Sequence, residues 1–402
     1  VFHNLIETGF EGPVYPVNPK AEVVQSVSAY PSVLDVPGEV DLAVVVVPAP
    51  AVASIARDCG EKGVKALLVI SSGFAEVGGD GETKQRELLS IARAYGMRIM
   101  GPNCMGLMNT HPDLKLNASF APTSPSAGRL GFSSQSGALG IAVIDRMREL
   151  GLGMSSFVSV GNKADISGND LLQYWENDPE TDVILLYLES FGNPRKFARI
   201  ARRVARNKPI VAVKSGRSQA GARAAASHTG SLAAGDVAVD ALFHQAGVIR
   251  TDTLEELFDV ASVLANQPLP KGRGVGILTN AGGLGILCAD ACEAAGLNVP
   301  EKYWQDVEKF WIAGASPAAV ELRRAVEDLG LRGVEIGTTV ENHQIACAAK
   351  RYVDTRRIAV HVGQLRQLGD LRVYLLAPHH RHRHDRSAGA IGKGARSFEV
   401  FL

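Results

Sequence analysis

Short apolar runs alternate with amphipathic segments along most of the chain, and this alternation restricts the fold more than any other feature. The most apolar run, Asp41–Val47, is rich in valine and is followed by Pro48 and Pro50. Such a run is typical of a fully buried strand in a parallel sheet. Further strands are predicted at 65–71, 97–100, 129–133, 182–189, 208–214 and 274–279. Helical patterns lie between them at 51–62, 82–95, 138–150, 195–207 and 253–266. The order predicts doubly wound α/β domains with right-handed crossovers.

Two stretches rich in proline and glycine, 121–128 and 267–272, divide the chain. Such stretches favour loops and domain boundaries. We therefore expect a first domain over 1–122, a second over 123–267 and the start of a third over 268–312, followed by a segment of different character over 313–402.

The composition excludes several classes of partner. Hydrophobic residues make up 46% of the chain and charged residues 21%, as in soluble globular proteins, and 42 basic residues balance 42 acidic ones. This balance gives no reason to expect nucleic acid or an anionic membrane as a partner. No apolar run reaches the roughly 18 residues of a membrane span, and no secretory signal is present. Five scattered cysteines predict free thiols in a reducing cytoplasm.

The loops after the strands are the candidate sites, because ligands of doubly wound sheets bind beyond the carboxyl ends of the strands. Four such loops occur in the first predicted domain, at 16–20, 47–50, 71–76 and 101–106. Each alone is a weak signal. Four along one edge predict an elongated ligand that lies over a Rossmann-like sheet.

Two glycine- and hydroxyl-rich loops have the order strand, loop, helix. In 131–139, Ser134 and Ser136 add hydroxyl donors beside Gly137. This loop is either a phosphate cradle at a helix start or a tight turn capped by serine. The loop 279–285, with Asn280, Gly282 and Gly283, repeats the arrangement. Neither is a Walker sequence, because no Gly-Lys-Ser/Thr follows.

His228 lies among small residues in Ala222–Ala234, where backbone amides and hydroxyls remain available to an anion. An imidazole there can act as a nucleophile that accepts and transfers a group. The alternative is a solvated polar cap before a helix that begins near Asp236. Glu189 ends a predicted strand, so it either orients an imidazole or forms a salt bridge with Lys214 or Arg217.

Six motifs occur in a common order between Phe2 and about Gly296: Pro-Val-Asn-Pro-Lys, Gly-Pro-Asn-Cys-Met-Gly, Ser-Gln-Ser-Gly-Ala, Tyr-Leu-Glu, Ser-His-Thr-Gly-Ser and Thr-Asn-Ala-Gly-Gly. In these motifs the chain resembles the nucleoside-diphosphate-forming acyl-CoA synthetases, which are relatives of the succinyl-CoA synthetase α subunit. The resemblance implies an α/β fold with a Rossmann-like CoA-binding domain followed by flavodoxin-like doubly wound domains.

The resemblance also implies an activity, that of an acid–thiol ligase of the ADP-forming acetate–CoA ligase type. Phosphate would convert an acyl-CoA to an acyl phosphate, which would phosphorylate His228, and the phosphohistidine would pass the group to ADP or GDP. Glu189 would orient the histidine. The remaining roles implied are CoA binding by Lys20, Val47, Pro48 and Pro50, a place near the thioester for Asn103, and phosphate binding by Ser134, Ser136, Gly137, Asn280, Gly282 and Gly283.

The chain also departs from this family. It opens at Val1 without methionine, and the family's first strand and glycine loop would precede that residue. No segment resembles an ATP-grasp domain, so ADP or ATP with Mg²⁺ would need a separate chain or domain, and we expect an oligomer. The alternatives are a non-catalytic CoA-binding or regulatory module and an inactive composite chain.

The last hundred residues carry weaker signals. Residues 321–338 resemble a helix–strand unit of the metal-dependent amidohydrolase and decarboxylase family, without its His-x-His metal ligands. His379–His384 lies in an arginine- and glycine-rich stretch that favours a disordered tail over a metal site. Cys288 and Cys292 are one helical turn apart and are expected to pack in a core, and Cys104 is expected to be structural. We expect no metal site.

Overall fold

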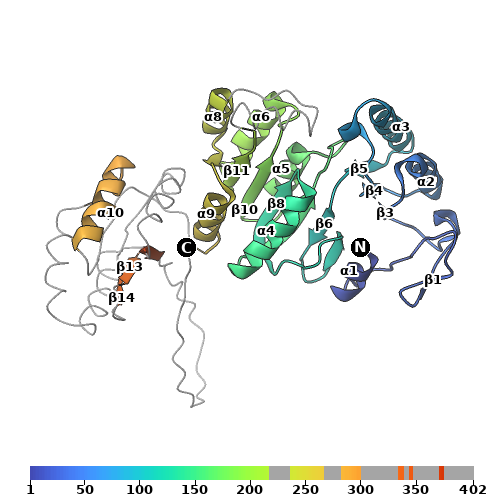
Figure 1. The fold of residues 1–402 in the computed structure, drawn as a ribbon, viewed down its shortest axis with the longest axis horizontal. Coiled ribbons are helices and arrows are strands. Elements are labelled where there is room, and N and C mark those ends of the chain that lie inside the picture. The colour runs from blue at the N-terminus through green and yellow to red at the C-terminus, as the bar shows by residue number, and fades with distance from the viewer. Residues whose placement is uncertain (217–235, 267–281, 300–333, 339–343, 347–370, 375–402) are drawn as a thin grey trace, which may run out of the picture. The chain divides into compact units, whose positions relative to one another are not determined.

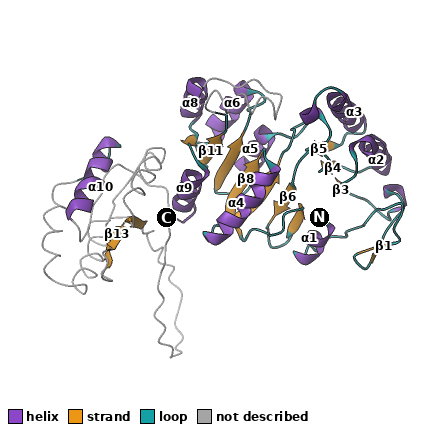
Figure 2. Ribbon diagram, in the orientation of Figure 1, coloured by secondary structure: helices purple, strands orange, loops and turns teal. Residues whose placement is uncertain are grey.

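The computed structural model describes residues 1–216, 236–266, 282–299, 334–338, 344–346 and 371–374 (Figure 1). Val1–Ala261 forms one compact unit and Ser262–Leu402 another. In the first unit, helices flank two sheets, as Figure 2 shows. Within the described residues, no helix is both long and apolar enough to cross a membrane.

The first sheet has three parallel strands in the order β3-β4-β5. Its bounds and those of its helices are β3 Leu42–Val45, α2 Ala49–Lys62, β4 Ala66–Val69, α3 Asp80–Ala94 and β5 Arg98–Met100. Shorter elements precede or interrupt it: α1 Phe2–Glu7, β1 Val23–Val24, β2 Val27–Ser28, η1 Val33–Asp35 and η2 Ala75–Val77. A buried core joins Leu67 and Ile99 of the sheet to Val52 of α2 and Leu88 of α3.

The strand at Asp41–Val47 is present as β3, but the expectation that it is fully buried was wrong. Leu42, Ala43 and Val44 are half-buried, and Val46 is exposed. The reason is that β3 pairs with β4 alone among the described strands and therefore lies at an edge of the sheet.

The second sheet has seven strands in the order β12-β11-β10-β8-β9-β6-β7. The strands β8 to β12 are parallel, and their order is the flavodoxin-like one. The bounds are β6 Gly106–Asn109, β7 Leu116–Ser119, β8 Ala127–Ser134, α4 Gly137–Glu149, β9 Met154–Ser159, α5 Gly168–Asn177, β10 Val183–Leu188, α6 Pro194–Val204, β11 Ile210–Lys214, α8 Asp236–Ala246, β12 Ile249–Thr251 and α9 Leu254–Asn266.

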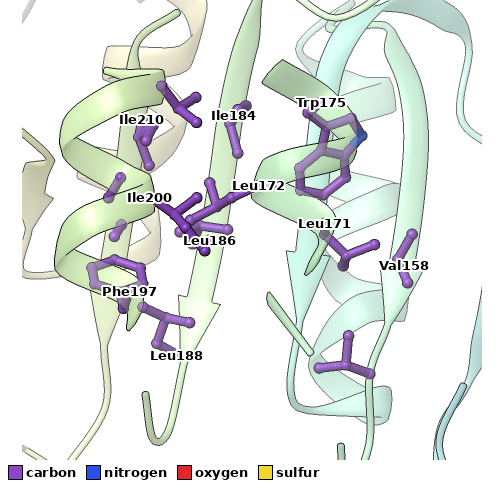
Figure 3. Close-up of a cluster of buried hydrophobic side chains, with 14 of the residues drawn as sticks. Val158, Leu171, Leu172, Trp175, Ile184, Leu186, Leu188, Phe197, Ile200 and Ile210 are labelled. Atoms are coloured by element: carbon purple, nitrogen blue, oxygen red, sulfur yellow. The ribbon is translucent and has the colours of Figure 1, made fainter. Parts of the chain in front are cut away.

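Helices α5 and α6 cover one face of this sheet, and Figure 3 shows the apolar contact. The buried side chains alternate along β10 and recur at helical spacing on α5 and α6: Ile184, Leu186, Leu188, Leu172, Trp175, Phe197 and Ile200. Helix α4 lies on the opposite face. Val158 belongs to the core beneath α5 and α6, so its strand neighbour Phe157 points to the other face, where a side chain at Gly140 of α4 would meet its ring. The α/β fold class and its parallel sheets are therefore confirmed.

Each predicted strand that falls on described residues is present, whereas β6, β7, β9 and β12 and the helix α5 were not predicted. The strands β6 and β7 pair antiparallel, and β6 also pairs antiparallel with β9. The sheet of the second predicted domain therefore reaches back to Gly106, before the boundary proposed near residue 122.

In the second unit, α10 spans Gly282–Ala294, and an antiparallel sheet joins β13 Val334–Thr338 to β14 Gln344–Ala346 and β15 Leu371–Tyr374. Cys288 and Cys292 are buried against Ala289, Leu297 and Val299. They form a small apolar core, as expected from their spacing. The predicted strand 274–279 and the segment His379–His384 lie outside the described residues.

Candidate functional site

The loops after β8 and β10 meet at the switch point of the second sheet. The two strands are neighbours, yet the chain continues from β8 to β9 on one side and from β10 to β11 on the other. Ligands of doubly wound sheets bind in the crevice outside such a point. The loop after β8 carries the predicted residues Ser134, Ser136 and Gly137, and the loop after β10 begins at Glu189.

Gln135 joins these two loops. Its side-chain oxygen accepts hydrogen bonds from the backbone amides of Glu189 and Ser190, at N···O distances of 2.8 Å and 2.9 Å. Its Nε2 donates to the carbonyl oxygen of Ser190 at 2.7 Å. The side chain therefore fixes Glu189 relative to the loop that begins α4.

The serines of the β8 loop are engaged within it. Ser134 is fully buried, and its hydroxyl donates to the carbonyl of Ser136 at 2.7 Å. The Ser136 hydroxyl accepts from the amide of Leu139 at 3.4 Å and caps α4. The loop thus has the geometry of a serine-capped turn. That geometry also directs the first amides of α4, which have no acceptor inside the helix, toward the sheet edge. A serine-capped turn and a phosphate cradle, the two interpretations of this loop, are therefore compatible.

Glu189 interacts electrostatically with two lysines, Lys163 after β9 and Lys214 at the end of β11. The Lys163 ammonium donates to the hydroxyl of Ser190 at 2.6 Å and to its carbonyl at 3.1 Å. Burial lowers the pKa of Lys163 to about 8, with Glu189 opposing this shift and Lys214 adding to it. Burial likewise lowers the pKa of Lys214, against the attraction of Glu189. The edge therefore brings two partly desolvated cations to one carboxylate.

A chain of hydrogen bonds links the carboxyl edge of the first sheet to this site. The Ser71 hydroxyl donates to the carbonyl of Val47 at 2.5 Å and accepts from its amide at 3.1 Å. The amide of Asn103 donates to the Ser71 carbonyl at 2.9 Å, and its side chain donates to the Oδ1 of Asn162 at 3.3 Å. Asn162 immediately precedes Lys163. Three of the four predicted loops, 47–50, 71–76 and 101–106, thus meet at one edge. That the loop 16–20 lies along the same edge stays a prediction.

Glu76 anchors the other side of Asn162. Its carboxylate accepts from the side-chain amide of Asn162 and from the backbone amides of Gly73 and Phe74. Burial acts to raise the pKa of Glu76, but these hydrogen bonds outweigh it, and the pKa lies below its ordinary value. Asn162 is therefore held by polar groups from two loops of the first sheet.

The remaining predicted residues lie apart from this network or beyond the described ones. Lys20, Pro48 and Pro50 are exposed, with Pro48 and Pro50 at the start of α2. Gly282 and Gly283 begin α10. His228 and Asn280 lie outside the described residues. The roles of these residues stay predictions. Among the described residues, no cluster of three metal-binding side chains occurs.

Cys104 is structural, as expected. It is buried, its thiol donates to the carbonyl of Val69 at 3.3 Å, and burial raises its pKa to about 12. A thiol with this pKa carries almost no nucleophilic thiolate near neutral pH.

Lys163 and Asn162 were not predicted as site residues, because the strand that precedes them was not predicted. The strand β9 contains Ser155, Ser156 and Ser159, which weaken its apolar pattern, yet all its residues are buried. Buried partners satisfy the hydroxyls: Thr181 for Ser155, Trp175 Nε1 for Ser156 and the Met105 amide for Ser159. The signal that remained was Gly161-Asn-Lys163, a glycine and a cation in a turn.

Two family models match the chain, one over the three-stranded parallel sheet and one over the parallel part of the seven-stranded sheet. A CoA binding domain matches residues 1–110, and a succinyl-CoA ligase like flavodoxin domain matches residues 127–264. The fold and these matches define a protein with a CoA-binding domain followed by a flavodoxin-like domain of the succinyl-CoA ligase type.

Individual similar proteins identify the family. The α subunits of ADP-forming acetate–CoA ligases I and II of Pyrococcus furiosus are 48% and 46% identical, over 303 and 313 residues. The solved dinucleotide-forming acetyl-coenzyme A synthetase 1 of Ca. Korarchaeum cryptofilum, in complex with phosphate and ADP, is 43% identical with a TM-score of 0.72. The chain belongs to the family of these ADP-forming acyl-CoA synthetases.

The match is partial in both directions. It covers 74% and 77% of this chain against the two Pyrococcus subunits and 78% against the solved structure. The chain spans 65% and 67% of the length of those subunits, and 68% of the solved chain.

Proposed function

We propose that this chain carries the acyl- and phosphoryl-transfer steps of an ADP-forming acid–thiol ligase. An oxygen of phosphate attacks the thioester carbonyl of an acyl-CoA, a C–O bond forms, and the C–S bond breaks. The thiolate leaves and takes up the proton from phosphate, so that the products are an acyl phosphate and CoA. His228 then takes the phosphoryl group, which releases the carboxylate.

One observation carries this proposal: the hydrogen-bonded path from Val47 to Glu189. It joins the edge of the domain matched as CoA-binding to the switch point of the flavodoxin-like domain. A thioester held at the first edge and an imidazole oriented at the second would lie at opposite ends of that path. Group transfer between them needs an anion site at the junction, and the start of α4 supplies amides of the right kind.

The nucleotide step needs a further protein part. The chain carries no segment that resembles an ATP-grasp domain, so ADP and Mg²⁺ would bind to a partner chain or domain. The phosphohistidine would deliver its group there. The solved relative binds phosphate and ADP, and the same two ligands are proposed for the assembled enzyme. The thiols of Cys59 and Cys104 are free and buried, which fits work in the cytoplasm.

Labelled acyl phosphate tests the proposal. The full chain is incubated with acetyl phosphate that carries ³²P, and protein-bound label is tested for acid lability and mapped. Acid-labile label on His228 is expected, and His228→Asn should abolish it. The matched control is His244→Asn, which changes an exposed histidine of α8 and should leave the label intact. A chain that binds CoA but takes no label would instead be a CoA-binding module.

A further inference from the structure

The Lys163 ammonium lies where the loops of the two sheets meet. The residues on either side of Lys163 are held by the loop that follows β5 of the first sheet. The backbone amide of Asn162 donates to the carbonyl of Pro102 at 2.9 Å, and the backbone amide of Ala164 donates to the carbonyl of Gly101 at 3.1 Å. Its side chain reaches the second-sheet side, where Ser190 accepts at 2.6 Å and 3.1 Å. One residue therefore spans the junction between the predicted thioester and phosphate sites.

The backbone at this point is constrained. Lys163 itself has φ +57°, a left-handed conformation that costs a non-glycine residue about 1 kcal/mol or more. Gly161 has φ +51°, and a Cβ there would lie 2.2 Å from the carbonyl oxygen of Pro102. Strain of this kind persists where the surrounding structure over-determines it, and it is concentrated at functional sites. The turn has the effect of aiming the lysine across the junction.

The ammonium has capacity for a ligand. It carries three N–H donors, and Ser190 accepts two hydrogen bonds from it. The described charged groups that act on Lys163 are Glu189, which favours its charge, and Lys214, which opposes it. The two ammonium groups attract an oxyanion, against the carboxylates of Glu189 and, at Lys214, of Asp236, while Arg250 adds positive charge near Lys214.

We propose that Lys163 binds the phosphate that attacks the thioester and then holds the acyl phosphate formed from it. This inference rests on the proposed function and assigns its anion site to a named side chain. A charge-assisted hydrogen bond from the ammonium would neutralise a phosphate oxygen while another oxygen attacks. The lysine stays protonated throughout, and the bonds made and broken are those of the transfer itself.

Binding of inorganic phosphate tests this directly. The dissociation constant is measured with ³²P-phosphate by equilibrium dialysis on the full chain and three variants. Lys163→Met should weaken binding by about tenfold or more, the loss expected for one charge-assisted hydrogen bond. Lys163→Arg keeps a cation and should stay within about threefold of wild type.

Lys208→Met is the matched control. Lys208 precedes β11, at the opposite end of the strands, and its ammonium is also held by carbonyls, those of Trp175 and Asp178. This variant should bind phosphate as wild type does. If folded Lys163→Met binds phosphate within twofold of wild type, or if wild type binds none, the inference is overturned.

A pH series on wild type keeps the test valid if Lys163→Met fails to fold. Loss of the ammonium charge above about pH 8 should weaken phosphate binding by wild type relative to Lys163→Arg, and the ratio cancels the titration of phosphate itself. A ratio that does not change between about pH 7 and about pH 9 contradicts the inference.

The phosphate measurement separates this inference from the proposed function. If His228 is labelled but Lys163→Met binds phosphate as wild type does, the inference about Lys163 is wrong and the proposed function stands. If wild type takes no label but binds phosphate through Lys163, the proposed ligase function is wrong. The bound phosphate then has no role in group transfer.

Discussion

The backbone amide of Glu189 donates a hydrogen bond of 2.8 Å to the side-chain oxygen of Gln135. Gln135 lies between Ser134 and Ser136, in the loop that begins α4. The bond crosses the switch point of the sheet, so the carboxylate that is proposed to orient His228 is set by the loop that is proposed to hold phosphate. The position of the Glu189 carboxylate and that of the loop before α4 therefore depend on each other.

Gln135→Ala should lower the free energy of unfolding by about 1–3 kcal/mol, because two backbone amides lose their acceptor and the Ser190 carbonyl keeps only the hydrogen bond from Lys163. It should also slow labelling of His228 by acetyl phosphate. Urea denaturation and the labelling rate measure the two effects. Gln173→Ala serves as control, since Gln173 makes one long bond of 3.4 Å within α5. Equal losses in the two variants would contradict the bridging role of Gln135.

Gly161→Ala should destabilise the chain by about 2–5 kcal/mol, which combines a left-handed alanine with a clash against Pro102. Gly151 offers a matched site: its φ is +67°, and a Cβ would meet nothing within 4 Å. Gly151→Ala should therefore cost only about 1–2 kcal/mol. Denaturation midpoints measure the difference. The close approach of the two loops would be disproved by a Gly161 variant as stable as the Gly151 variant.

The parallel strands could be predicted because burial on the sheet faces requires continuous apolar runs. Val183–Leu188 and Ile210–Lys214 are examples. Strand β9 escaped prediction because its serines are satisfied by tertiary partners, which periodicity does not reveal. The antiparallel pair β6 and β7 is short, and half of each strand is glycine, asparagine or serine. Such strands depend on pairing with the neighbouring sheet, not on local preference.

The candidate site could be predicted only in part, for a related reason. Glycine and serine loops after strands are visible in the sequence, and the motifs located Glu189 and Asn103. The bonds that join them were not visible, because Gln135 and Asn162 are polar residues in turns and nothing local distinguishes them from solvated ones. Lys163 became significant only once the topology set its loop beside Ser190.

Protonation of Glu76 should weaken the contact between its loop and Asn162. The folded-state pKa lies below the ordinary value of 4.5, so the carboxylate stabilises the fold above pH 4.5, and this contribution is lost as the pH falls through the lower folded value. The unfolding free energy of wild type should therefore fall more steeply below pH 4.5 than that of Glu76→Gln. Urea midpoints across an acid pH series measure the slopes. Glu22→Gln changes an exposed glutamate and should keep the wild-type slope. Parallel slopes for wild type and Glu76→Gln would refute this account of the contact.

Cys104 should resist alkylation in the native chain. Its buried thiol, with a pKa of about 12, offers iodoacetamide neither access nor thiolate. Mass spectrometry of the peptide that contains Cys104 should show modification only after unfolding in urea, which provides the internal control. Rapid modification of the native chain would reopen a nucleophilic role for this residue.

The central claim is that one chain passes a phosphoryl group from the CoA side of the junction to His228. The most direct measurement uses ³²P-labelled inorganic phosphate with acetyl-CoA as the probe, no nucleotide, and parallel detection of free CoA thiol. We expect acid-labile label on His228 that requires acetyl-CoA, accompanies CoA release and disappears in His228→Asn. Release of CoA without label on His228, or label that persists in His228→Asn, would contradict it.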